Sequence, residues 1–192
     1  DVSSTLGDTE SMEWYPKLAA SYQFGELAGY FDNLKLRFAR GETGNMPSPS
    51  AKYSAMGLSN IGGVNGLLVS SVKGNAGIKP ERTAETEFGA DFSVMDGLAT
   101  VELTMYTQKI SDLILLVDVP ASSGASASWQ NGGEMETKGT EFTLGLNPTK
   151  LVDAGGLDWN FQMTYYKSES EVTKLTVDPY NYGGFADFLG TY

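Results

Sequence analysis

The sequence predicts an all-β chain, an antiparallel up-and-down transmembrane β-barrel segment of roughly six long strands. Two observations predict this fold. Apolar and polar residues alternate along several stretches, many of them near the ~9–11 residues that a tilted strand needs to cross a bilayer. The connections between these stretches alternate between short and long, as an up-and-down barrel requires. We therefore treat residues 1–192 as one partial barrel domain.

The strand expected from Leu34 to Arg40 shows the alternation most clearly. One face carries the apolar residues Leu34, Leu36 and Phe38. The other face carries Lys35 and Arg37, because successive side chains of a strand point to opposite sides. The stretch from Trp14 to Phe24 alternates in the same way and predicts a preceding strand. A glycine-rich turn is expected to end the second strand at Gly41.

Further strands are expected along the rest of the chain. The stretch from Thr83 to Val94 alternates, and the Asp-Gly pair at Asp96 is a hairpin signal that leads into a strand beginning at Ala99. Two later strands are expected from Glu141 to Leu146 and from Leu157 to Tyr166. Each of these strands has one apolar face and one polar face.

The expected connections are of two kinds. The comparatively brief ones are Gly25–Asn33, Met95–Gly97 and Asn147–Gly156. The long ones, Gly41–Arg82 and Gln108–Lys138, are rich in Gly, Ser, Ala and Asn. In outer-membrane barrels the short turns face the periplasm and the long loops face the outside.

Composition excludes several classes of function. The chain has no Cys and no His, so His-ligated or thiolate metal sites and Ser-His-Asp or Cys-His catalysis are excluded. A formal net charge of -11 argues against a nucleic-acid partner, because no basic stripe is available for phosphates. No apolar run approaches the length of a transmembrane helix, and no signal peptide opens the chain, so we expect a mature piece. We expect no cofactor and no enzymatic activity.

Three blocks of residues carry a family resemblance. They are Leu34 to Asn45, Lys79 to Asp91, and Asn131 to Glu141. Together they resemble the carboxyl-terminal half of the barrel in TonB-dependent outer-membrane transporters of the SusC/RagA type. The second and third blocks resemble TonB-dependent receptors generally, whereas the Gly-Glu-Thr-Gly-Asn stretch and Gly-Glu-Met-Glu are similar to the SusC subgroup.

The resemblance implies a function and a location. It implies a bacterial outer-membrane transporter with a barrel of about 22 strands and a folded plug in its lumen. Such a transporter imports a nutrient, an oligosaccharide or a peptide, with energy transmitted by TonB through the plug. It works with a SusD-like surface lipoprotein over its outer mouth. Roughly six strands cannot close such a barrel, so we expect this chain to be a fragment without the plug, set in outer-membrane lipid.

Candidate site residues follow from the polar faces and the loops. The residues expected to face the lumen or the plug are Lys35, Arg37, Glu85, Glu87, Asp91, Glu102 and Glu141. We expect the two basic residues to pair with some of these acids across neighbouring strands. In the second long loop, Trp129, Gln130 and Asn131 place an aromatic ring beside amide groups, a combination suited to contact with substrate or a partner.

Two other classes of protein share parts of this pattern. A soluble β-sandwich carbohydrate-binding module also has alternating strands and Gly-rich loops, but its apolar faces pack beneath a second sheet. A glycosidase needs two acids placed across a substrate, which Glu85 and Glu87 on one strand do not provide by themselves. Covered apolar faces would therefore support the sandwich, and exposed ones the barrel.

Overall fold

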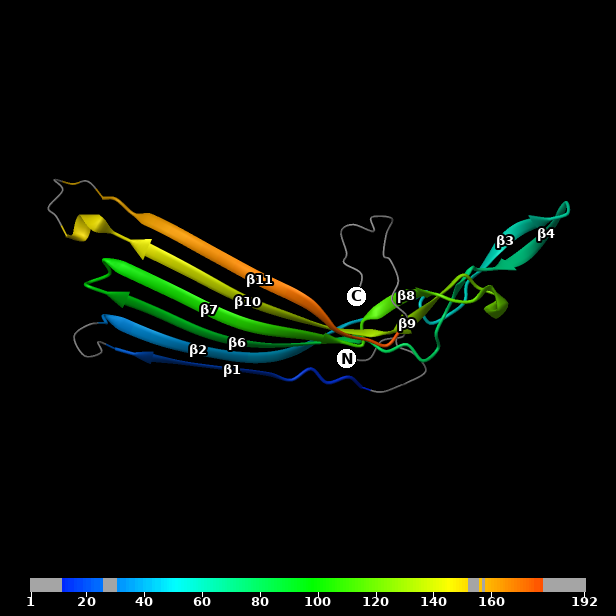
Figure 1. Cartoon of the computed structure of the whole chain (residues 1–192), viewed down its shortest axis with the longest axis horizontal. Helices are drawn as coiled ribbons and strands as arrows, with labels where there is room; N and C mark the ends of the chain where they lie inside the picture. Colours follow the sequence, from blue (N-terminus) through cyan, green and yellow to red (C-terminus); the bar gives the residue numbers. More distant parts are fainter. Residues whose placement is uncertain (1–11, 26–30, 152–155, 157, 178–192) are drawn as a thin grey trace.

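The computed structural model of the chain describes residues 12–25, 31–151, 156 and 158–177. Six long strands form one antiparallel sheet in the order β1-β2-β6-β7-β10-β11, and they lie side by side (Figure 1). They are β1 (Lys17–Phe24), β2 (Asn33–Asn45), β6 (Glu81–Val94), β7 (Ala99–Ser111), β10 (Gly133–Leu146) and β11 (Phe161–Leu175). We call this sheet the wall. Its strands follow one another in chain order, which confirms the predicted up-and-down arrangement.

The remaining strands lie beyond one end of the wall (Figure 1). β3 (Met56–Ile61) and β4 (Val64–Val69) form a hairpin. β5 (Val72–Lys73), β9 (Ala127–Asn131) and β8 (Ile114–Asp118) form a small sheet in that order. All of them belong to residues 46–80 and 112–132, which we call the loop module. The described residues also include two short 3₁₀ helices, η1 (Ala121–Ser123) and η2 (Pro148–Lys150). Across the described residues, no helix has the length and apolar character to span a membrane.

The opposite end of the wall carries the shorter connections, of which the β6–β7 turn is the tightest. β6 and β7 are joined by a turn in which Met95 and Asp96 have φ of 55° and Gly97 has φ of 75°. The Asp32 carboxylate, just before β2, accepts hydrogen bonds from the backbone N–H groups of Asp96 at 3.0 Å and Gly97 at 2.8 Å. Asp32 therefore stabilises this turn. The bounds of the wall strands confirm the predicted alternation of short and long connections.

The strands are longer at the loop-module end than the sequence indicated. Residues 41–45, 108–111 and 133–138 were expected in loops but belong to β2, β7 and β10. The predicted turn at Gly41 is therefore wrong. At Gly44 a β-carbon would collide with the Tyr15 ring, so this glycine provides room for a close approach within the strand. At the other boundaries, β1 begins at Lys17, β11 begins at Phe161, and Leu157 lies outside the described residues.

The wall has two chemically different faces. The register aligns apolar residues in rows, for example Leu36 opposite Ala90 and Phe38 opposite Phe88. We call this the apolar face, and many of its side chains are exposed, including Leu18 (66%) and Phe88 (59%). Among the described residues, the buried hydrophobic side chains all lie in the loop module: Ala51, Ile78, Val117 and Ala127. Among the described residues no second sheet covers the apolar face, which contradicts the β-sandwich alternative.

Candidate functional site on the polar face and in the loop module

The polar face of the wall is organised around one arginine. Arg37 on β2 reaches across to β6, where its Nε and Nη2 atoms donate to the two carboxylate oxygens of Asp91, both at 2.9 Å. Its Nη1 atom donates to Glu87 at 3.1 Å. The bidentate geometry uses the planar fork of the guanidinium, which a lysine does not possess. The expected pairing of a basic residue with acids of a neighbouring strand is therefore present.

Two further residues hold Arg37 in place. Its Nη2 atom also donates to the Thr104 hydroxyl on β7, at 3.1 Å. Gly89 lies directly opposite Arg37 in the register, and a β-carbon at Gly89 would lie 2.7 Å from the guanidinium carbon. The guanidinium thus lies across a glycine, and this network links β2, β6 and β7.

A small recess lies farther along the polar face, toward the loop module. Gln108 donates to Glu85 at 2.9 Å, and the hydroxyl groups of Tyr106 and Tyr166 are 3.1 Å apart. Gly139 lies beneath the Tyr106 ring, where a β-carbon would collide with it. The recess has a volume of about 310 Å³ and is lined by Glu85, Glu87, Thr104, Tyr106, Gln108, Thr137 and Glu141.

A second recess shares three of those residues. It has a volume of about 560 Å³ and includes Glu85, Glu87 and Gln108 together with Lys17 and Gly41. The two recesses therefore adjoin, and their linings carry more carboxylates than cationic groups. Within the described part of the chain, no group of three His, Cys, Asp or Glu residues is arranged to hold a metal ion.

All seven residues expected to face the lumen or the plug lie on the polar face. Lys35 is opposite Asp91 in the register, and Asp91 is opposite Glu102. Glu141 lines the smaller recess. Five of the seven are acids and two are bases, so this part of the face is acidic. The structure brings Arg37 together with Glu87 and Asp91, whereas Lys35 forms no ion pair with another described residue.

Trp129, Gln130 and Asn131 lie in the second long connection as expected, but in a strand and not in an irregular loop. These residues belong to β9, which pairs with β8 and β5 in the small sheet. Trp129 is half-buried, not an exposed platform. The Asn131 side chain is taken up by the backbone: its amide donates to the carbonyl oxygens of Lys79 and Asp112, both at 2.9 Å. Its carbonyl oxygen accepts from the Lys79 N–H, also at 2.9 Å. Contact of these residues with a substrate or partner stays a prediction.

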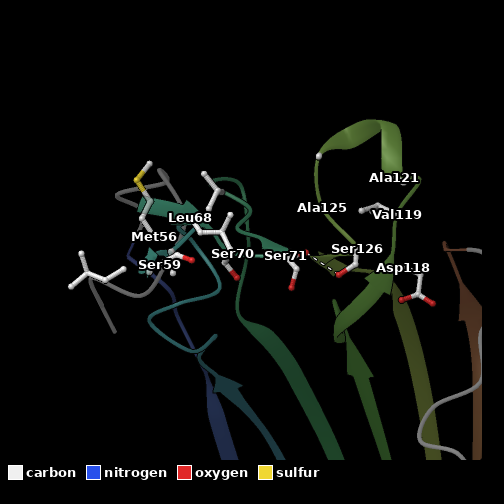
Figure 2. Close-up of a pocket in the computed structure, with 15 residues that line it drawn as sticks. Met56, Ser59, Leu68, Ser70, Ser71, Asp118, Val119, Ala121, Ala125 and Ser126 are labelled. Atoms are coloured by element: carbon white, nitrogen blue, oxygen red, sulfur yellow. Dashed lines mark hydrogen bonds between the residues drawn. The ribbon is translucent and has the colours of Figure 1, made fainter. Parts of the chain in front are cut away.

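The loop module contains a cleft that sequence reasoning missed. It lies between the β3–β4 hairpin and the segment from Asp118 to Ser126 (Figure 2), and its volume is about 1220 Å³. Apolar side chains such as Met56 and Leu68 line it beside several serine hydroxyl groups. At its base, the backbone N–H and the hydroxyl group of Ser126 donate to the Ser71 carbonyl oxygen at 2.8 and 3.1 Å.

A sequence signal for the hairpin beside this cleft was available. Residues 53–72 contain no charged residue, and Gly62-Gly63 is a two-residue hairpin signal within that run. Both glycines have positive φ, 63° and 90°, and the Asn60 side chain accepts from the Gly63 N–H at 2.8 Å. The hairpin exposes apolar side chains, with Leu58 88% and Val64 70% accessible. The sequence therefore allowed the hairpin to be predicted, although not the cleft beside it.

The wall defines a class of protein, a segment of an outer-membrane β-barrel, and comparison with known proteins names its family. The model of the TonB dependent receptor-like β-barrel family matches residues 1–191. The chain therefore belongs to this family, whose members are bacterial outer-membrane proteins, and the resemblance noted in the sequence is confirmed.

The chain is similar to several individual proteins. TonB-dependent receptor P26 of Formosa agariphila is 28% identical over 83% of this chain and 19% of its own length. TonB-dependent receptor SusC of Bacteroides thetaiotaomicron is 30% identical over 53% of this chain and 10% of its own length. The RagAB peptide importer in its closed-closed state superimposes with a TM-score of 0.81 at 20% identity, covering 96% of this chain and 21% of the importer chain. The chain thus spans about a fifth of the length of its first relatives.

Proposed function

We propose that this chain is part of the wall and outer loops of a TonB-dependent importer that takes up a nutrient, an oligosaccharide or a peptide. The observation that carries this proposal is the two-faced wall. Its apolar face suits lipid, and its polar face offers carboxylates and hydroxyl groups to a water-filled or plugged lumen. Family membership supports the same assignment.

The polar face is the surface we assign to the plug. Glu85, Glu87 and Glu141 line its recesses, and they offer acceptors to cationic or hydroxyl groups of a plug domain. Arg37 already pairs with Glu87 and Asp91, so we assign it to holding the neighbouring strands and carboxylates in position. In this scheme TonB acts through the plug, and displacement of the plug opens the lumen.

The loop module is the surface we assign to cargo and to a SusD-like surface lipoprotein. Within the described residues the β3–β4 hairpin forms a sheet of its own, and a two-stranded hairpin is marginally stable in water. Its exposed apolar side chains favour contact with another protein surface. The cleft beside it combines apolar and hydroxyl groups, which suits either a peptide or a sugar.

Removal of the hairpin tests this assignment. In the full-length receptor, residues 56–69 are replaced by a short Gly-Ser linker, and two quantities are measured: uptake of labelled cargo and co-purification of the lipoprotein. We expect both to fall while barrel assembly is retained, because the hairpin contributes no ladder hydrogen bond to the wall.

A matched control separates partner contact from loop length. The variant Met56→Ser/Leu58→Ser/Leu67→Ser keeps the length of the hairpin and removes exposed apolar surface. It should reduce co-purification nearly as much as the deletion. Normal uptake together with normal co-purification in the deletion variant would remove the hairpin from the mechanism. Uptake that persists without TonB would contradict the proposed function itself.

A further inference from the structure

The apolar face changes character toward the loop module in the same way on five strands. Beyond the apolar rows, the first charged residue on this face is a cation each time. These cations are Arg40 on β2, Arg82 on β6, Lys109 on β7, Lys138 on β10 and Lys167 on β11. A face that merely became solvated would not require the first charge to have the same sign on all five strands.

Four of these cations follow one diagonal. Arg82 is opposite Ser111, two residues beyond Lys109. Lys109 is opposite Glu136, two residues before Lys138. Lys138 is in turn opposite Glu169, two residues beyond Lys167. The first cation therefore lies two residues nearer the short-turn end with each successive strand.

Strand tilt brings this diagonal close to a single height. Consider strands that lie about 4.8 Å apart and tilt by about 45°. On each next strand, the point at the same height in the membrane is displaced along the strand by about 4.8 Å from the residue directly opposite. Only every second residue faces outward, so the nearest step on one face is two residues, about 6.8 Å. The last large apolar residue descends in the same sense from Met105 to Phe142, and Tyr165 lies directly opposite Phe142.

The height of this row also fits the edge of a bilayer. On β6 the apolar face carries no charge from Ala84 to Val94, which is about 34 Å along the strand and about 24 Å in height at that tilt. An outer-membrane barrel has an apolar band about 25 Å tall. Arg82 is the next outward residue, so the row lies where lipid headgroups begin.

Carboxylates lie one step farther out than the cations. On three strands, two residues beyond the cation, the outward face carries Glu42, Glu136 and Glu169. Glu136 lies between two ammonium groups, with Lys109 Nζ at 2.9 Å and Lys138 Nζ at 2.5 Å. Lys167 Nζ is 2.7 Å from Glu169. The positive charges thus face the apolar band, and the negative charges lie on the side away from it.

The three lysines remain accessible despite these pairs. The side chains of Lys109, Lys138 and Lys167 are 67%, 70% and 59% exposed. Arg82 is different, because it pairs with Glu13 and Glu42 and lies over the Tyr15 ring. Long lysine side chains can extend along apolar surface and keep the ammonium group at a polar boundary. We call these three residues the lysine row.

We propose that the lysine row binds the phosphate groups of anionic lipids in the outer leaflet of the membrane. Phosphate is the anion that headgroups present at this height, and ammonium groups bind it as point charges. The outer carboxylates keep the side chains extended, and they repel anionic groups approaching from the solvent side. The occupant is therefore a membrane lipid and not a free anion.

Binding of phosphorylated lipid by the full-length receptor tests this proposal. The purified receptor in neutral detergent is titrated with bisphosphorylated lipid A or with its dephosphorylated form, and bound lipid is counted by native mass spectrometry. We expect Lys109→Gln/Lys138→Gln/Lys167→Gln to weaken binding of the phosphorylated lipid about 100-fold, because the loss of each cation should weaken it about fivefold. Binding of the dephosphorylated lipid should not change.

Two further variants keep the test falsifiable. The control Lys52→Gln/Lys73→Gln/Lys79→Gln removes the same charge from the loop module and should leave lipid binding unchanged. Glu136→Gln/Glu169→Gln frees the lysines from their internal partners and should strengthen binding of the phosphorylated lipid. Unchanged lipid binding in both the lysine triple variant and the glutamate double variant would overturn the proposal. Complete displacement of the bound lipid by inorganic phosphate would show that the site binds a free anion, and would also overturn the proposal.

Discussion

The wall and the loop module are stabilised by opposite means. In the described residues, the buried hydrophobic side chains lie in the loop module, whereas the wall exposes apolar side chains along one whole face. A soluble protein would be expected to bury its largest sheet. We infer that the wall is stabilised by ladder hydrogen bonds and by surrounding lipid. The loop module, by contrast, folds like a small water-soluble unit around its own core.

The loop module is one unit although it comes from two connections. β5, from the first connection, pairs in parallel with β9 from the second. Asn131 binds the backbone at Lys79 and Asp112. Glu81, at the start of β6, accepts from the Ile114 N–H at 2.9 Å and from the Asn45 amide at 2.7 Å. These bonds attach the loop module to the adjacent end of the wall.

The largest expected effect separates the two regions through the loop core. Ile78 is fully buried, so Ile78→Ala should destabilise the loop module by roughly 2–5 kcal/mol. Limited proteolysis should then cut residues 46–80 faster, while heat-modifiable migration of the barrel is unchanged. Ile61→Ala is the control, because Ile61 is 58% exposed. Loss of barrel assembly in the Ile78 variant would mean that the two regions fold as one.

A charge on the apolar face tests the wall. Leu103 lies between Ala90 and Phe142 in the register, and Leu103→Arg should cost about 2–4 kcal/mol of folding free energy in lipid vesicles. Thr143→Arg places the same side chain on the polar face, opposite Glu102, and should be better tolerated. Urea titration of both variants measures the contrast. Equal losses of stability would show that the two faces are assigned wrongly.

The smallest expected effect concerns the link between the two connections. Asn131→Ala removes three hydrogen bonds to backbone groups and should destabilise the loop module by about 1 kcal/mol. Hydrogen exchange at the Lys79 N–H should become faster, with the wall amides unchanged. Asn65→Ala is the control, because the Asn65 side chain makes no hydrogen bond to another described residue. Unaltered exchange at Lys79 would contradict the role of Asn131 as a link.

The sequence by itself determined which face each wall residue occupies. Side chains alternate with a period of two along a strand, so Leu36 and Arg37 are separated without knowledge of any partner strand. The Asp-Gly turn before β7 and the contrast of short and long connections were likewise local signals. The loop-module ends of β2 and β10 were not predicted, because glycine in a sequence favours a loop. Only the structure shows that other side chains occupy the space beside these glycines.

Only the tertiary structure decided which residues meet. Register between strands depends on long-range pairing, so the contact of Arg37 with Asp91 and Glu87 and the diagonal of the lysine row could not be located from the chain alone. The same holds for Asn131, whose amide is used by backbone groups that are distant in sequence. The two-residue period of a strand fixes the face of the sheet on which each side chain lies. The contacts between strands depend on their register, which is set by long-range pairing.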